Sequence, residues 1–190
     1  SEAEFSGYWD PAVGGSFFAA FRDLRMVLDY GLLAVLDGEL ALLLDDEGQG
    51  SLLGDVSVQK GVLTRPINLD RDFLMDFLRP VDLTGSEESA LELIELDLSL
   101  STRQGIKVQN NLADLRLRWN PLSIRGNLAL PVVLGQVNVD SGGLVSLYGQ
   151  TFRLDKAVID YPGRPGVEPD MQLELTSSLQ DQSIVRLKGG

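Results

Sequence analysis

Apolar and polar side chains alternate along most of this chain, and this alternation constrains the fold more than any other feature. Residues 114–119, for example, alternate Leu115, Leu117 and Trp119 with charged residues. Such a period of two is the signature of a strand that buries one face. The pattern recurs in three further segments, at 91–101, 136–140 and 171–178. Because Gly, Asn and Pro separate these runs as turn signals, we predict a fold that is mainly all-β.

The alternation changes phase once in the C-terminal part of the chain. The inward positions pass from Phe152 and Leu154 to Ala157, Ile159 and Tyr161. One extra residue in a strand moves every later side chain to the other face, and a β-bulge supplies such a residue. We therefore predict a turn or bulge at Asp155-Lys156.

Two segments depart from the strand pattern. Residues 68–79 place apolar side chains at helical spacing and end just before Pro80, so we predict one short helical insert there. Residues 1–22 contain Gly7, Pro11, Gly14 and Gly15, and we expect a loosely structured N-terminal segment. Residues 16–30 fit either a helix or a strand, and we favour a strand from Leu24 on.

Three short blocks recur in the same order along the chain. They are 23–26 with 114–117, 38–42 with 126–130, and 54–61 with 135–142. The recurrence predicts two repeat-like halves, 23–63 and 114–163, joined by the helical insert at about 68–79. We take 23–190 as a single domain.

Composition excludes several functions. The chain has no Cys and no His, which removes disulfides, thiolate nucleophiles and imidazole bases; we expect no enzyme, no cofactor and no metal. A net charge of −12 disfavours nucleic acid and flat contact with anionic lipid headgroups. Asp45, Asp46 and Glu47 could serve a glycosidase or bind calcium, but we favour a solvated turn.

Two architectures fit the alternating strands, and the sequence pattern alone favours the first of them. In a β-sandwich, two sheets stack and bury their apolar faces against each other. In the alternative, one long sheet curls so that its apolar face lines a groove that an apolar ligand fills. Periodicity does not distinguish them, because both place every second side chain on the buried face.

The segment 148–178 resembles the C-terminal domain of the TamB family. The resemblance rests on Tyr148-Gly149-Gln150, followed by alternating strands around Phe152, Ile159 and Met171 and separated by a Gly- and Pro-containing loop. The preceding residues 126–150 are also similar to that family, and 23–63 is similar through the internal repeat. The order and lengths of the blocks carry the resemblance, since no single short motif is specific.

The resemblance implies a long curled β-sheet with an apolar concave groove, a β-taco-like fold, as a single β-groove domain over 23–190. TamB-like proteins of the AsmA-like group lie in the periplasm, anchored in the inner membrane by a segment not in this chain, and are implicated in phospholipid transport and outer-membrane assembly. Their partner is TamA, an outer-membrane barrel protein, bound through a C-terminal segment that we expect to be absent here.

The resemblance therefore implies a groove that shields phospholipid acyl chains. We expect nine residues to line it: Val137, Val139, Phe152, Leu154, Ile159, Tyr161, Met171, Leu173 and Leu175. An alternative function is a scaffold or chaperone that receives client strands at a sheet edge. Because the chain begins without Met and ends in strand-like sequence, we expect a piece of a longer protein whose exposed edges could pair in a homodimer.

Overall fold

The computed structural model describes residues 1–28, 31–66, 91–147, 149–165, 168–177 and 184–189. Thirteen strands make up the regular structure of these residues. They are β1 (Glu2–Asp10), β2 (Gly14–Leu28), β3 (Leu32–Leu44), β4 (Gly50–Leu63), β5 (Ile94–Thr102), β6 (Ile106–Gln109), β7 (Ala113–Trp119), β8 (Leu122–Asn127), β9 (Pro131–Val139), β10 (Leu144–Leu147), β11 (Gln150–Pro162), β12 (Asp170–Ser177) and β13 (Ile184–Gly189). The all-β prediction is confirmed.

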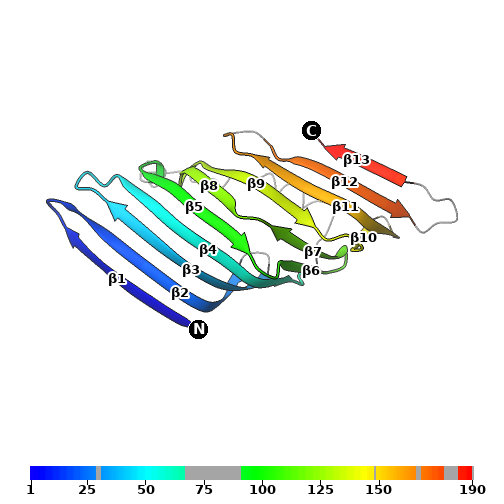
Figure 1. Ribbon diagram of the computed structural model, residues 1–190, viewed down its shortest axis with the longest axis horizontal. Coiled ribbons are helices and arrows are strands. Elements are labelled where there is room, and N and C mark those ends of the chain that lie inside the picture. Colours follow the sequence, from blue (N-terminus) through cyan, green and yellow to red (C-terminus); the bar gives the residue numbers. More distant parts are fainter. Residues whose placement is uncertain (29–30, 67–90, 148, 166–167, 178–183, 190) are drawn as a thin grey trace.

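All thirteen strands belong to one large curled sheet, with β1 at one edge and β13 at the other (Figure 1). The β-sandwich alternative is therefore wrong for the described residues, which form one layer. Neighbouring strands are antiparallel, except that β4 runs parallel to β5 and to β6. Most sequential strands are also spatial neighbours, so the sheet extends along the chain like a ribbon folded back and forth.

Three rows of the sheet consist of two strands placed end to end. β5 and β6 both lie beside β4, along Gly50–Val58 and Gly61–Leu63 respectively. β8 and β7 form the next row against β5 and β6. β9 and β10 follow, and both pair with β11. Each break replaces a few ladder hydrogen bonds by turns, which lets a long sheet bend along its length.

β4 and β5 are parallel neighbours: Gly50 pairs with Ile94, so both strands start at the same end of the sheet. The helix predicted at about 68–79 lies outside the described residues.

The predicted bulge at Asp155-Lys156 is confirmed. Leu154 pairs with Leu175 but Lys156 pairs with Glu174, so Asp155 is the extra residue on β11. A second bulge interrupts β2 opposite Asp37, where Asp23 has a positive φ of 51°. The Asp23 backbone N–H donates to the Asp37 carboxylate at 2.7 Å, which satisfies a group that the ladder leaves unpaired.

The N-terminal segment is not loosely structured, and that prediction is wrong. Residues 2–10 form β1, and β2 begins at Gly14. The glycines are needed for packing rather than for flexibility: Gly7 stands opposite Phe17, and a Cβ at Gly7 would lie 2.6 Å from Cδ1 of that ring. Only Gly leaves room for an aromatic ring on its backbone.

The repeated blocks do not occupy equivalent places in the sheet. In the first copy they lie on β2, β3 and β4, which are three successive antiparallel strands. In the second copy, 114–117 lies on β7 and 126–130 begins at the end of β8. These two strands are placed end to end beside β9 and do not pair with each other. The division into halves 23–63 and 114–163 therefore describes the sequence, and its structural meaning stays a prediction.

Candidate functional site

The strand registers determine which side chains share a face of the sheet, because directly paired residues point the same way. Ile159 pairs with Met171 on one side and with Val137 on the other. Val137 in turn pairs with Trp119. Following such pairs from strand to strand assigns every strand position to one of two faces of the sheet.

One face, named the apolar face here, runs without interruption from β1 to β12. Outside the bulges it carries no charged side chain on these strands. Its larger members include Phe5, Trp9, Phe17, Phe21, Leu36, Leu40, Leu42, Leu52, Leu98, Ile124, Leu117 and Trp119, together with the nine residues predicted from the sequence. The opposite face, named the charged face, holds the Lys, Arg, Asp and Glu side chains of these strands outside the bulges.

The core of the described residues lies entirely on the apolar face. Its buried hydrophobic side chains are Ala34, Val58, Leu96, Val108, Leu122, Val137, Leu154, Ala157 and Leu175. Apart from a small contact between β5 and β7, every strand pair in substantial contact is a hydrogen-bonded pair, so no second layer of described strands covers these side chains. They are shielded by neighbours on the same face, as the curl of the sheet allows.

The structure brings all nine predicted residues to this one face but does not give them equal access to solvent. Leu154 and Leu175 are 1% and 2% exposed and centre a small packed cluster. Met171 is 45% exposed at the end of β12. The other members of the set are buried or half-buried. This C-terminal part of the apolar face is thus largely filled by its own side chains.

The N-terminal part of the same face is more open, and the sequence-based prediction did not include it. An apolar hollow of about 440 Å³ is lined there by Phe5, Phe17, Leu40, Leu42 and Leu52, among others. Phe5 and Phe17 are 80% and 41% exposed. Consecutive apolar residues such as 40–44 hide the alternation in this region, so periodicity gave no clear signal.

Glycines opposite aromatic rings shape this open part. Besides Gly7 and Phe17, Gly38 stands opposite Phe21, and a Cβ at Gly38 would lie 2.7 Å from Cζ of the ring. Each ring therefore lies against a glycine backbone of the neighbouring strand, the arrangement called aromatic rescue.

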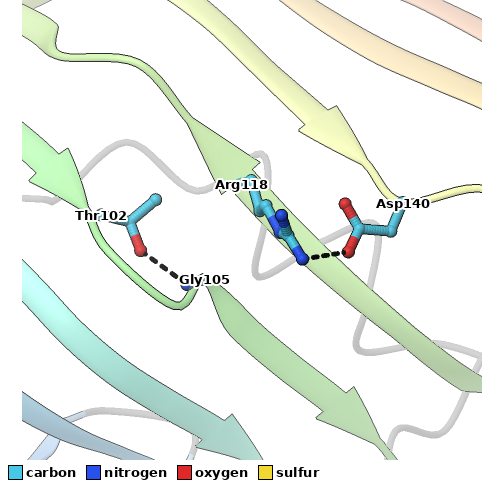
Figure 2. A network of polar contacts seen from close by, with 4 residues as sticks. All are labelled: Thr102, Gly105, Arg118 and Asp140. Carbon is cyan, nitrogen blue, oxygen red and sulfur yellow. Dashed lines mark hydrogen bonds and ion pairs between the residues drawn. The ribbon is translucent and has the colours of Figure 1, made fainter.

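Polar groups at the break between β5 and β6 are satisfied locally (Figure 2). Thr102 lies on the apolar face, where its hydroxyl accepts from the Gly105 N–H at 2.9 Å and donates to the Val58 carbonyl at 3.2 Å. On the charged face, Arg118 pairs with Asp140 at 2.9 Å. The break thus adds no free polar group from Thr102 to the apolar face.

The acidic turn at 45–47 has the geometry of a self-capped loop. The Asp45 carboxylate accepts from the backbone N–H groups of Glu47 and Gln49, as the turn interpretation predicts. Within the described part of the chain, no cluster of three or more His, Cys, Asp or Glu side chains is arranged to hold a metal ion. Arg116 and Arg118 lie on the face opposite Leu117 and Trp119, so they do not stack on that Trp.

A single-layered, all-β scaffold with one continuous apolar face is the class of protein that these features define. Residues 20–189 match the sequence model of the TamB C-terminal domain, and the chain belongs to this family. Its role is accordingly TamB-like, in outer-membrane assembly. The family acts with TamA in the translocation and assembly module, as a non-enzymatic, periplasmic component anchored in the inner membrane in its full-length form.

A search of curated proteins finds no match to this chain. The strand β1 precedes the matched residues yet pairs with β2 along its whole length, so the sheet includes more of the chain than the family match covers. None of the described residues forms a helix of the length and hydropathy needed to span a bilayer.

Proposed function

We propose that the apolar face lines a concave groove that shields phospholipid acyl chains during transport between the inner and outer membranes. The observation that carries this proposal is the continuity of the face, which crosses twelve strands without a charged side chain outside the bulges. A layer of described strands that would cover it is absent. Large exposed apolar surfaces of this kind mark interaction sites.

The energetics of such a groove suit transport. Each acyl methylene removed from water contributes about 0.8 kcal/mol, so a chain of about 16 carbons that is fully withdrawn from water gains roughly 13 kcal/mol. A lipid that moves along this face exchanges apolar contacts for other apolar contacts and passes no charged side chain outside the bulges. The charged face meanwhile keeps the scaffold hydrated, with ion pairs such as Arg125–Asp97.

Photolabelling tests which face the acyl chains occupy. A phospholipid with a diazirine at the end of one tail is bound to the detergent-free protein, irradiated, and the adducts are mapped by mass spectrometry. Neighbouring residues of one strand serve as matched positions, since Leu98 lies on the apolar face and Ser99 on the charged face. Adducts confined to apolar-face residues support the groove; adducts spread equally over both faces would contradict it.

A second candidate function, strand addition by client proteins, is favoured by the edge strand β1. All nine of its residues are exposed, and its outer edge pairs with no described strand. The strand contains no Pro and no Lys to block pairing. Ser6→Pro would remove a backbone donor of this edge strand, so client capture would fall several-fold with this variant, whereas Leu98→Arg on the apolar face would leave client capture unchanged.

A further inference from the structure

One part of the charged face gathers positive charge. Lys107 on β6 pairs directly with Arg116 on β7, and like charges in such a position destabilise the pairing of two strands. Arg118 lies on the same face, and the Cγ atoms of both arginines lie beside Gly105, within 3.2 Å of the place that a Cβ there would take. Lys60 lies on the other side of Gly105, across the pairing of β4 with β6. We name these four side chains, Lys60, Lys107, Arg116 and Arg118, the basic patch.

The carboxylates of the chain neutralise the basic patch only in part. Arg118 pairs with Asp140 at 2.9 Å (Figure 2), whereas the ion pair that Lys107 forms is 3.9 Å long. Lys60 and Arg116 are exposed and form no ion pair with any carboxylate in the part of the chain that the structure describes. A local surplus of positive charge in a chain with a net charge of −12 creates a field that attracts anionic groups.

A hollow of the opposite sign lies on the same face, over β1–β4. Glu39 on β3 pairs directly with Asp55 on β4, so two anions stand side by side there. They line a hollow of about 510 Å³ together with other charged side chains, which are Glu2, Glu4, Asp37 and Arg22. The registers place these side chains on the charged face. This acidic hollow is concave and has a surplus of negative charge, so it suits long cationic side chains that protrude from another surface.

The spacing of the two features suits a reciprocal contact. Asp55 and Val62 are seven residues apart on β4, and Val62 pairs with Lys107, so the acidic hollow and the basic patch lie roughly 20–25 Å apart. Two copies that stack their charged faces about a two-fold axis between these features place each basic patch over the acidic hollow of the other copy. A contact about 35 Å long and about four strands wide covers roughly 650 Å² of each copy, and the total of about 1,300 Å² falls within the range of specific interfaces.

We propose that the charged face is a self-complementary docking surface for a second copy of this chain, in which the basic patch of each copy enters the acidic hollow of the other. Like-charge pairs that are unfavourable within one sheet thereby meet opposite charges in the dimer. At physiological ionic strength the Debye length is about 8 Å, so the repulsion between the net charges of the two copies is largely screened. The contact leaves the apolar face free, so this proposal and the proposed function can fail independently of each other.

Charge reversal on either side of the contact tests the pairing. Sedimentation equilibrium of the unaltered chain is expected to show a dimer with a dissociation constant on the order of 10–100 μM. The double variant Glu39→Lys, Asp55→Lys reverses the acidic pair, and Lys107→Glu, Arg116→Glu reverses the basic pair. Each variant alone, once circular dichroism has verified its fold, is expected to raise the dissociation constant by about tenfold or more, because like charges then face each other.

An equimolar mixture of the two double variants separates this contact from any other mode of association. In the mixed pair both contacts again join opposite charges, so a heterodimer should form with about the affinity of the unaltered dimer. The matched control Asp160→Lys, Asp170→Lys reverses a third like-charge pair on the same face and should leave the dimer unchanged. An unaltered chain that stays monomeric up to about 200 μM would overturn the proposal. Failure of the mixture to associate would overturn it as well.

Discussion

Leu154 on β11 stands directly opposite Leu175 on β12, and these two side chains are 1% and 2% exposed although both belong to a single layer of strands. Their cover comes from Val139, Val145 and Leu173 on the same face. A flat sheet would leave such side chains about half exposed to solvent, so their burial reflects the curl of the sheet toward its apolar face. The curl thus gives a one-layered sheet a core.

Truncation of Leu154 tests this core. Leu154→Ala is expected to lower the free energy of unfolding by about 2–5 kcal/mol, because it removes a fully buried side chain and leaves a cavity. Leu134→Ala is the matched control, since Leu134 is 48% exposed, and should cost about 1 kcal/mol or less. Urea denaturation measures both values. Equal losses for the two variants would mean that this part of the sheet has no packed core.

Gly61 on β4 pairs with Ile106 on β6, where these two strands run parallel. A Cβ at Gly61 would lie 2.9 Å from Cγ1 of Ile106, and its other near contacts belong to the same side chain. Gly61→Ala should therefore destabilise by about 1–3 kcal/mol through overpacking. In an Ile106→Ala background the same substitution should cost much less. A double-mutant cycle measures this coupling. If Gly61→Ala cost the same free energy in both backgrounds, its destabilisation would not come from overpacking against Ile106.

The bulge in β2 depends on Asp37. Asp37→Ala removes the carboxylate that accepts from the Asp23 N–H, and we expect a loss of about 1 kcal/mol because the site is exposed. Asp37→Asn keeps a carbonyl acceptor and should recover part of that loss. Thermal unfolding of the three proteins checks the order. If Asn proved worse than Ala, the hydrogen bond would not be what stabilises the bulge.

The Arg118–Asp140 pair should contribute little to stability. Its side chains are 54% and 40% exposed, and exposed ion pairs typically contribute between 0 and about 1 kcal/mol. Asp140→Asn is therefore expected to change the unfolding free energy by about 0.5 kcal/mol or less, with a smaller effect at high salt. A loss of several kcal/mol would instead indicate that the pair anchors the turn after β9.

The strands and one bulge could be predicted because each changes the alternation of apolar and polar residues within a single segment. The apolar alternation changes phase between Leu154 and Ala157, and this change predicts the extra residue at 155 without knowledge of the partner strand. In contrast, β1 could not be recognised, since Gly7 and Gly15 suggested flexibility. Their function is to accommodate the rings of Phe17 and Trp9, and that pairing exists only between strands.

The candidate site was predictable only in part for a similar reason. The nine residues from Val137 to Leu175 were placed on a common face by alternation, and the register confirms that they share it. Their role as groove lining stays a prediction. The open hollow on β1–β4 was missed, because Ala41 and Leu43 make the charged face apolar in that region as well, and exposure depends on how strands curve together.

Phospholipid transfer by the intact protein that contains this chain tests the role of the apolar face most directly. Leu98→Arg places a charge in the middle of that face, and Ser99→Arg places the same charge on the opposite face of the same strand. Both variants are compared with the unaltered protein after circular dichroism has verified folding. We predict that Leu98→Arg reduces transfer by tenfold or more, because an acyl chain that passes a charged arginine loses about 2–3 kcal/mol of favourable contact. We predict that Ser99→Arg transfers normally. Normal transfer by a folded Leu98→Arg protein would contradict the proposal that acyl chains travel on this face.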